Sequence, residues 1–184
     1  MAKRKKKNNI PEIIPIRSKK GTLFEKVVNM YYSWGHPDQP EIPKSQTRTS
    51  VENMFDHPDG YLFALTLRGQ IIGCYIGTTI GALLERGAVP SNEDFWKVVE
   101  RFGNDVVNNT FYGAFIRVSD GHQGSGYGSR LMERSVQIAR AQERSHFAFT
   151  TNNPRALETY GRLLREPIFT KPSDFDRTFY LHEL

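Results

Sequence analysis

The chain has 184 residues, 38% of them hydrophobic and 12% aromatic, which suits one folded domain and leaves little room for two. Its single cysteine excludes a disulfide framework and a cysteine-based zinc site, and no apolar stretch is long enough to span a bilayer. The formal charge of +5 belongs to the segment from Lys3 to Lys7, because the other 20 Lys and Arg balance 20 Asp and Glu.

This basic segment is predicted to be part of a disordered tail, residues 1–10, because a block of like charges repels itself and stays solvated. Weak contact with nucleic acid through residues 3–7 is the alternative role. No apolar leader follows the basic residues, so we expect a cytoplasmic protein without membrane association. Residues 11–184 are predicted to form the folded domain.

Hydrophobic periodicity and turn residues predict the regular elements of this domain. In chain order they are a strand over 12–17, a helix from Thr22 to a stop at Gly35 and Pro37, a short helix over 50–55, strands over 61–67 and 70–79, a helix over 92–102, a strand over 110–118, a helix over 128–142, a strand over 146–151, a helix from Pro154 and a final strand over 177–182. The strands over 61–67 and 70–79 are apolar for most of their length, so Cys74 is expected in the core.

The stretch His122–Met132 carries the strongest functional signal. Three glycines at alternate positions, Gly124, Gly126 and Gly128, follow a strand and run directly into a helix. The first N–H groups of a helix lack intrahelical partners and carry partial positive charge, so such a turn can bind a phosphate. A P-loop is excluded because no Lys follows the glycines, and a dinucleotide fingerprint would sit too late in the chain for a doubly wound sheet.

A third pattern, Q/R-x-x-G-x-G/A, is matched by Gln123, Gly126 and Gly128. Here the stretch resembles the coenzyme A loop of the GNAT superfamily of N-acetyltransferases. Further along the chain, Asn153, Ala156 and Tyr160 match the N-x-x-A-x-x-x-Y segment of the same family. Two motifs in the family's order make the resemblance specific.

The resemblance implies an α/β (α+β) fold with a single GNAT-like domain. Its centre would be a mixed, mostly antiparallel sheet of six to seven strands, flanked by about four helices. The strands over 110–118 and 146–151 would start side by side and then splay apart. Residues 82–108 would be an extra helical insertion between the third and fourth strands. It either lines the acceptor side of the cleft or forms a homodimer contact.

The implied function is transfer of an acetyl group from acetyl-coenzyme A to a primary amine, directly and within a ternary complex, without a metal. Tyr160 is the implied acid for the leaving thiolate, because an ordinary Tyr pKa of about 10 keeps its proton at neutral pH. The implied cofactor-binding residues are Ile116, Val118, Gln123, Gly124, Ser125, Gly126, Tyr127, Gly128, Ser129 and Asn153. A GNAT fold that binds coenzyme A or a protein or nucleic-acid partner without turnover is the rival reading.

The sequence leaves several alternatives for the base that deprotonates the amine and for the molecule that accepts the acetyl group. Glu85, His146 and His122 are candidate bases, and a water chain is the alternative. The acceptor is a small-molecule amine, a peptide amine or an aminoacyl-tRNA. Aromatic and acidic residues that suit a cationic amine gather early in the chain, and the alternative, which we favour, is that they are core plus a solvated loop: Tyr31, Tyr32, Trp34, His36, Asp38 and Glu41.

Overall fold

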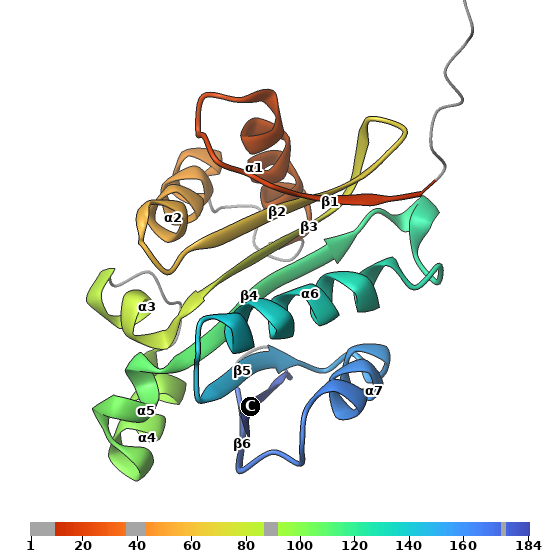
Figure 1. Ribbon diagram of the computed structural model, residues 1–184. Coiled ribbons are helices and arrows are strands. Elements are labelled where there is room, and N and C mark those ends of the chain that lie inside the picture. Colours follow the sequence, from red (N-terminus) through yellow and green to blue (C-terminus); the bar gives the residue numbers. More distant parts are fainter. Residues whose placement is uncertain (1–9, 36–42, 87–91, 174–175) are drawn as a thin grey trace, which may run out of the picture.

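The computed structural model describes residues 10–35, 43–86, 92–173 and 176–184 (Figure 1). The basic tail, His36, Asp38 and Glu41 therefore lie outside the described residues. The described elements are β1 (Glu12–Pro15), α1 (Thr22–Gly35), α2 (Lys44–Asp56), β2 (Tyr61–Leu67), β3 (Gln70–Thr79), α3 (Ile80–Arg86), α4 (Asn92–Phe102), α5 (Asn104–Asn108), β4 (Thr110–Val118), a 3-10 turn (Asp120–His122), α6 (Tyr127–Ala141), β5 (His146–Thr151), α7 (Pro154–Leu163), β6 (Phe169–Pro172) and β7 (Thr178–Glu183).

Seven strands of the described chain form one sheet in the order β1-β2-β3-β4-β5-β7-β6. Every neighbouring pair is antiparallel except β4 and β5, which run parallel. The hairpin between β2 and β3 turns at Arg68 and Gly69, whose φ values of 53° and 80° fit a tight two-residue turn. The predicted mixed, mostly antiparallel sheet is confirmed.

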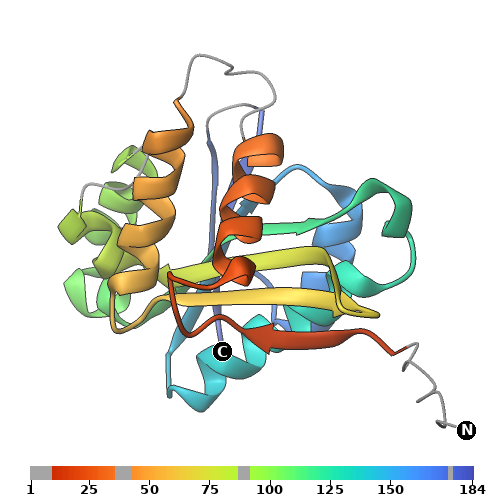
Figure 2. The same ribbon diagram turned by 90° about the horizontal axis from the view of Figure 1, so that it is seen from above.

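Helices cover both faces of the sheet, so the core has two layers (Figure 2). On one face, α1 and α2 contribute Phe24, Val28 and Val51 to a cluster that also holds Cys74. On the other face, α6 and α7 pack Leu131 and other apolar side chains on the sheet. The strands between these layers are buried on both sides, which explains their nearly continuous apolar sequences.

The connection between β3 and β4 holds three short helices, α3 to α5, where one had been predicted. Phe95 and Val98 of α4 are buried in the cluster beneath α1 and α2. The ring of Phe95 meets the rings of Tyr112 and Phe179 edge to face, at centroid distances of 5.1 and 5.9 Å. This connection therefore packs on the sheet of its own chain.

Helix α2 and strand β6 also differ from the sequence prediction. Helix α2 begins at Lys44, six residues before the predicted start at Ser50, because its first turns are polar and give no apolar period. The Arg48–Glu52 ion pair, one helical turn apart with 2.8 Å between Nε and Oε1, supports that polar segment instead. Strand β6 was not predicted, because four residues ending in proline carry too little alternation to be recognised.

Cys74 is fully buried, as predicted, and burial raises the pKa of its thiol to about 12. The thiol therefore keeps its proton at neutral pH and lacks the thiolate that a nucleophile requires. Across the described ranges, no helix has the length and hydropathy to cross a membrane.

Candidate functional site

The glycine turn lies between the end of β4 and the start of α6, where the sequence places it. Gln123 holds the turn in shape, because its side-chain amide donates to the carbonyl of Val118 at 3.3 Å and to Asp120 Oδ1 at 2.8 Å. Arg117 donates to the same carboxylate oxygen at 3.1 Å. These side-chain hydrogen bonds therefore hold the start of the turn against the end of β4.

Two of the three glycines adopt a conformation that other residues avoid. Gly124 has φ of 79° and Gly126 has φ of 76°, whereas Gly128 is an ordinary helical residue. A Cβ placed on Gly124 or Gly126 would meet no atom within 4 Å, so their backbones face open space. Gly126 is also the N-cap of α6 and offers no capping side chain. The first N–H groups of α6 thus lack a side-chain cap, as an anion site requires.

The other turn residues are arranged around this open backbone. Ser125 is exposed, and Tyr127 is half-buried at the first position of α6. The hydroxyl of Ser129 lies 3.0 Å from that of Thr159 on α7, so it ties the two helices together. Any contact of Ser129 with an anion therefore falls to its main-chain N–H.

Strands β4 and β5 form a fork whose open end faces the glycine turn. They pair from Thr110 to Gly113 on β4 and from His146 to Phe149 on β5. Beyond that point β4 continues to Val118 beside β3 alone, so the splayed pair is confirmed. A shift in register places Ala114 as an extra residue at the point where the strands part.

The hydrogen-bond pattern shows which backbone groups face the fork. Ser119 donates its N–H to Ile72 of β3 at 2.8 Å. In an antiparallel ladder the direction alternates from residue to residue, so Val118 and Ile116 turn their N–H groups away from β3 and into the fork. These are the two strand residues named from the sequence.

Tyr160 of α7 lies at the vertex of the fork. Its ring is 3% exposed and stacks on Phe149, the partner of Gly113, with centroids 4.0 Å apart. Its hydroxyl oxygen is 3.5 Å from the position of a Cβ on Gly113. The phenol of Tyr160 thus lies within van der Waals distance of Gly113, where the two strands separate.

A second phenol, which sequence reasoning missed, reaches the same point. Tyr75 of β3 is fully buried, and its hydroxyl oxygen lies 3.6 Å from the same Cβ position on Gly113. Among the described residues no hydrogen bond of good geometry reaches that oxygen, and the group beside it is the buried hydroxyl of Ser135, which also neighbours Tyr160. Gly77, the cross-strand partner of Gly113, makes the space for it, because a Cβ on Gly77 would collide with the Tyr75 hydroxyl. Gly77, two residues after Tyr75 on the same strand, was the available sequence signal.

Burial controls the charge of both phenols. It raises the pKa of Tyr75 and of Tyr160 well above the ordinary value, because a phenolate would lose its hydration there. Both hydroxyls therefore carry their protons at neutral pH and can donate them.

Asn153 caps α7. Its side-chain oxygen accepts the N–H of Arg155 at 3.0 Å, and Pro154 occupies the first helical position, as the sequence predicts. The side chain is exposed just after the end of β5, on the side of the fork's opening.

The three candidate bases are not brought to the fork vertex. His146 pairs with Thr110 at the closed end of the fork, and burial lowers its pKa. Glu85 on α3 also lies past that end, exposed, with its carboxylate 3.8 Å from His57 Nε2. His122 lies beside the glycine turn, where Nδ1 is 2.9 Å from the Ser119 hydroxyl.

The proposed acceptor cluster is described only in part. The ring of Tyr31 packs edge to face on Phe115 of the fork at 4.7 Å, and burial raises the pKa of its phenol. Tyr32 is half-buried on the same helix, and the side chain of Trp34 is outside the described part.

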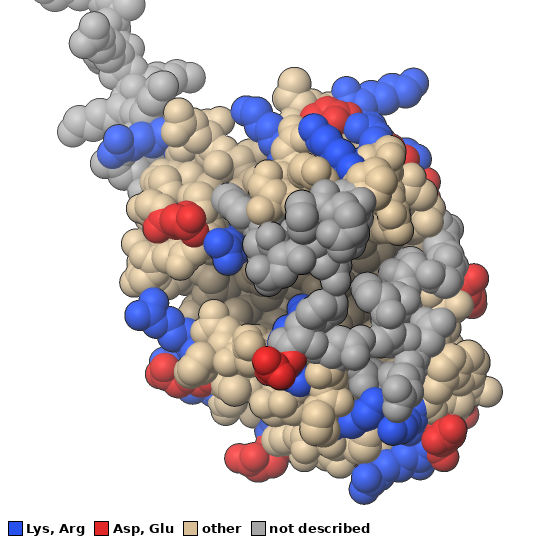
Figure 3. Space-filling view, turned by 180° about the vertical axis from the view of Figure 1, so that it is seen from behind, with Lys and Arg blue, Asp and Glu red and all other residues tan. Residues whose placement is uncertain are grey.

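On the face turned away from the viewer in Figure 1, acidic and basic side chains are interspersed (Figure 3). The described ranges contain no group of three or more His, Cys, Asp or Glu side chains suited to a metal ion.

Comparison with known proteins gives a family and a fold. No curated protein matches the chain. The chain is similar in structure to the C-terminal condensation domain of Ebony in complex with beta-alanyl-dopamine, with 9% identity and a TM-score of 0.64. The match covers 96% of this chain and 100% of that domain. An N-acetyltransferase from Staphylococcus aureus Mu50 (12% identity, TM-score 0.60) and the NatC complex bound to Gag peptide and CoA (12% identity, TM-score 0.58) each match 95% of this chain and 98% of theirs. At these identities the likeness shows the fold.

The family model described as the acetyltransferase (GNAT) family matches residues 24–164. That range runs from α1 through α7 and contains both the glycine turn and the fork. The chain therefore belongs to the GNAT family of acetyltransferases.

Proposed function

We propose that the protein is an N-acetyltransferase that moves an acetyl group from acetyl-coenzyme A to a primary amine, directly and within a ternary complex. The observation that carries the proposal is the fork between β4 and β5, with the glycine turn at its open end and Tyr160 at its vertex. A long ligand with an anionic end and a reactive end fits this linear arrangement of backbone donors and phenol.

The chain's groups fit coenzyme A from the glycine turn to the vertex. The main-chain N–H groups from Gln123 to Ser129 would hold the pyrophosphate, because Gly124 and Gly126 leave their backbones accessible. The backbone of Ile116 and Val118 would bind the pantetheine arm as an added strand binds a sheet edge. Asn153, at the start of α7, is placed to add a polar contact beside the fork.

Acetyl-coenzyme A, when bound, supplies an acetyl group activated as a thioester. A backbone N–H of β4 in the fork, from the bulged Ala114 to Val118, stabilises negative charge on the acetyl oxygen as the amine attacks. Tyr160 donates its proton to the departing sulfur, since burial keeps the phenol neutral. Tyr75 places a second neutral hydroxyl at the same vertex, beside the buried hydroxyl of Ser135.

Water is the proposed base that accepts the proton from the attacking amine. Glu85 and His146 lie at the closed end of the fork, and the described acceptor face offers aromatic rings. The acceptor class stays as broad as a small-molecule amine, a peptide amine or an aminoacyl-tRNA. In the neighbouring structures, Ebony holds beta-alanyl-dopamine and NatC holds a peptide with CoA, so this fold accommodates both small and peptide ligands.

The test combines binding and turnover. Calorimetry with acetyl-coenzyme A should show binding, and a thiol-release assay over amines, peptides and aminoacyl-tRNA should find an acceptor. Gly126→Val should abolish binding by blocking the open backbone. Gly69→Val is the matched control, because Gly69 has a similar positive φ, 80°, and equally open surroundings in the β2–β3 hairpin.

A second variant avoids backbone strain. Ser125→Glu places a negative charge on the exposed turn and should weaken binding by a factor that shrinks as salt is added. Normal affinity in a folded Gly126→Val protein would refute the turn as the binding site. Tight binding without turnover on the whole panel would favour a non-catalytic coenzyme A module instead.

A further inference from the structure

A buried serine lies beside the two phenols of the fork vertex. Ser135 belongs to α6, the helix that packs on β3 and β4, and its side chain is 0% exposed. The hydroxyls of Tyr75 and Tyr160 are both neighbours of its own hydroxyl. The two phenol oxygens also lie within 3.6 Å of one point, the position of a Cβ on Gly113. Hydroxyl groups from β3, α6 and α7 therefore meet at the vertex.

The packing of α6 gives no reason for a serine at this position. The other residues that the helix buries are apolar: Leu131, Val136, Ile138 and Ala139. An alanine at position 135 would have a higher helix propensity and no polar group to satisfy. The serine therefore points to a role for its hydroxyl.

The hydroxyl of Ser135 has a partner that it can leave. It donates to the main-chain carbonyl oxygen of Met132, in the preceding turn of α6, at 2.7 Å. In an α-helix the same carbonyl also accepts the N–H of the residue four positions later, here Val136. A hydroxyl hydrogen rotates to suit its surroundings. The carbonyl of Met132 thus keeps one hydrogen bond when the hydrogen of Ser135 turns elsewhere.

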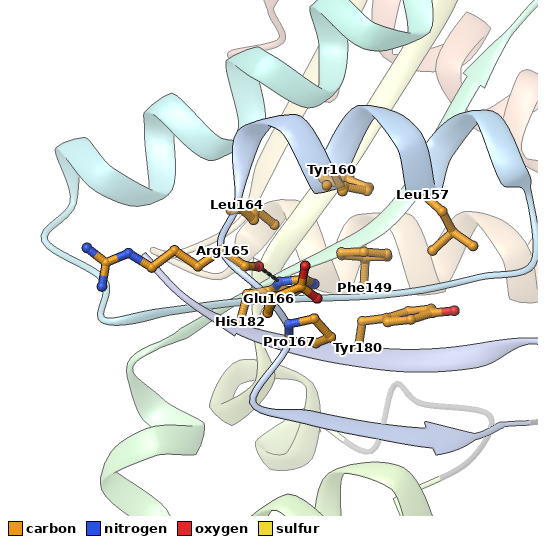
Figure 4. Close-up of a pocket in the computed structure, with 10 residues that line it drawn as sticks. Phe149, Leu157, Tyr160, Leu164, Arg165, Glu166, Pro167, Tyr180 and His182 are labelled. Atoms are coloured by element: carbon orange, nitrogen blue, oxygen red, sulfur yellow. Dashed lines mark hydrogen bonds between the residues drawn. The ribbon is translucent and has the colours of Figure 1, made fainter.

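The phenol of Tyr160 is fixed next to this hydroxyl. Its ring projects from α7 above Phe149, on which it stacks with centroids 4.0 Å apart (Figure 4). Because the ring is held and Ser135 is buried in a helix, only a hydrogen atom has to move for the serine to reach the phenol oxygen. A donor that is already in place stabilises developing charge without reorganisation of the protein.

Loss of the Tyr160 proton would make that movement favourable. The phenol is 3% exposed, so water offers little hydration to a phenolate there. A hydrogen bond to a charged oxygen is about twice as strong as one to a neutral carbonyl, so the hydrogen of Ser135 should leave Met132 for the phenolate. Tyr75 can then donate to the oxygen of Ser135, and a chain of hydroxyls strengthens each of its hydrogen bonds.

We propose that Ser135 is a positioning residue for the acid: its hydroxyl turns from Met132 to the Tyr160 oxygen when this phenol gives up its proton, and it stabilises the phenolate. The inference rests on the proposed acetyl transfer. In that reaction the O–H bond of Tyr160 breaks, the proton binds to the departing sulfur, and the electron pair stays on the phenol oxygen. The proton that water takes from the amine later returns to this oxygen. Because the interaction forms only as the proton moves, it raises turnover without strengthening substrate binding.

The first test follows the phenolate and requires no acceptor. A difluorinated tyrosine at position 160 is more acidic than tyrosine and titrates at lower pH, and fluorine NMR reports its charge. Ser135→Ala should raise the midpoint of this titration by about one pH unit, which corresponds to a tenfold loss of phenolate. Ser50→Ala is the matched control, because the Ser50 hydroxyl also donates within its own helix, α2, at 3.1 Å to the carbonyl of Gln46. An unchanged midpoint in Ser135→Ala would overturn the proposal.

The second test is a double-mutant cycle on turnover. Ser135→Ala should lower kcat about tenfold in the wild-type chain, the usual effect of one hydrogen bond, with an unchanged KM for acetyl-coenzyme A. In Tyr160→Phe the same change should lower kcat by less than about twofold, because no phenolate forms there. Equal losses in the two backgrounds would overturn the proposal, since a serine that only packs or bonds Met132 would act on both alike.

A conservative variant and the fold are checked together. Ser135→Cys keeps nearly the same size and a weak donor, so it should recover part of kcat. Circular dichroism checks the fold of each variant, and Ser135→Cys gives the same comparisons with smaller shifts if Ser135→Ala does not fold. A raised midpoint without turnover on any acceptor would support the hydroxyl interaction and reject acetyl transfer, so the two failures are distinguishable.

Discussion

The ring of Tyr160 stacks on the ring of Phe149 with centroids 4.0 Å apart and an interplanar angle of 19°. Phe149 is itself the last β5 residue paired with β4, through Gly113. The stack therefore fixes the phenol at the point where the sheet opens. Because the ring makes this contact and the hydroxyl does not, a mutation can remove the hydroxyl and leave the ring packing in place.

Tyr160→Phe should lower turnover by about a hundredfold, the lower range for loss of a general acid, while leaving affinity for acetyl-coenzyme A nearly unchanged. The ring stack is retained, so the unfolding temperature should change little. The measurement is steady-state kinetics beside calorimetry. Tyr61→Phe is the control, because it also removes one phenolic hydroxyl, which accepts a bond from Gln142 at the end of α6. Unchanged turnover in Tyr160→Phe would remove the acid role.

Tyr75→Phe should raise stability and lower turnover together. A buried hydroxyl without a partner costs about 1–3 kcal/mol, and its removal should raise the free energy of unfolding by about 1 kcal/mol. Turnover should fall because the second hydroxyl at the vertex is lost. Urea unfolding and the thiol-release assay measure the two effects. A variant that is less stable would show that the Tyr75 hydroxyl is satisfied in solution.

Stability should fall at high pH. The pKa values of Tyr75 and Tyr160 are raised in the folded state, so their contribution is complete below the unfolded value of about 10 and is lost as pH rises above it. Each group then removes about 1.4 kcal/mol per pH unit until its folded pKa is reached. Urea midpoints between pH 8 and 11 give the slope. Tyr75→Phe should show a shallower decline, and parallel curves would contradict the assignment.

Cys74 should be unreactive in the native protein. Burial raises its pKa to about 12, so at pH 8 the thiolate is scarce and the sulfur is covered. An aromatic disulfide reagent should label the chain in urea and leave the native chain unlabelled. Cys74→Ala should keep full turnover at a cost of about 1 kcal/mol in stability. Loss of turnover on native labelling would indicate a covalent route through this sulfur.

The sequence predicted the fold well where pattern and length agree. The bounds of β2, β3, β4 and β5 follow directly from apolar runs between turn residues. Strand β6 and the polar start of α2 could not be predicted, because their stability comes from neighbours and ion pairs rather than from their own period.

The site was predictable in part for the same reason. The glycine turn and the cap at Asn153 are local, so a few adjacent residues predict them. The fork was predicted from family resemblance. The meeting of Tyr75 with Tyr160 requires the register of Gly77 opposite Gly113, which no single segment of sequence contains.

The hydrogen bond between the hydroxyls of Ser129 and Thr159 connects two halves of the chain. Strands β1 to β4 all precede α6 in the chain and β5 to β7 all follow it, so two consecutive halves of the polypeptide meet along four residue pairs. The Ser129–Thr159 contact joins α6, which packs on the first half, to α7, which packs on the second. A ligand bound between β4 and β5 would contact both halves of the sheet. Hydrogen exchange of the backbone amides should then become slower in both halves.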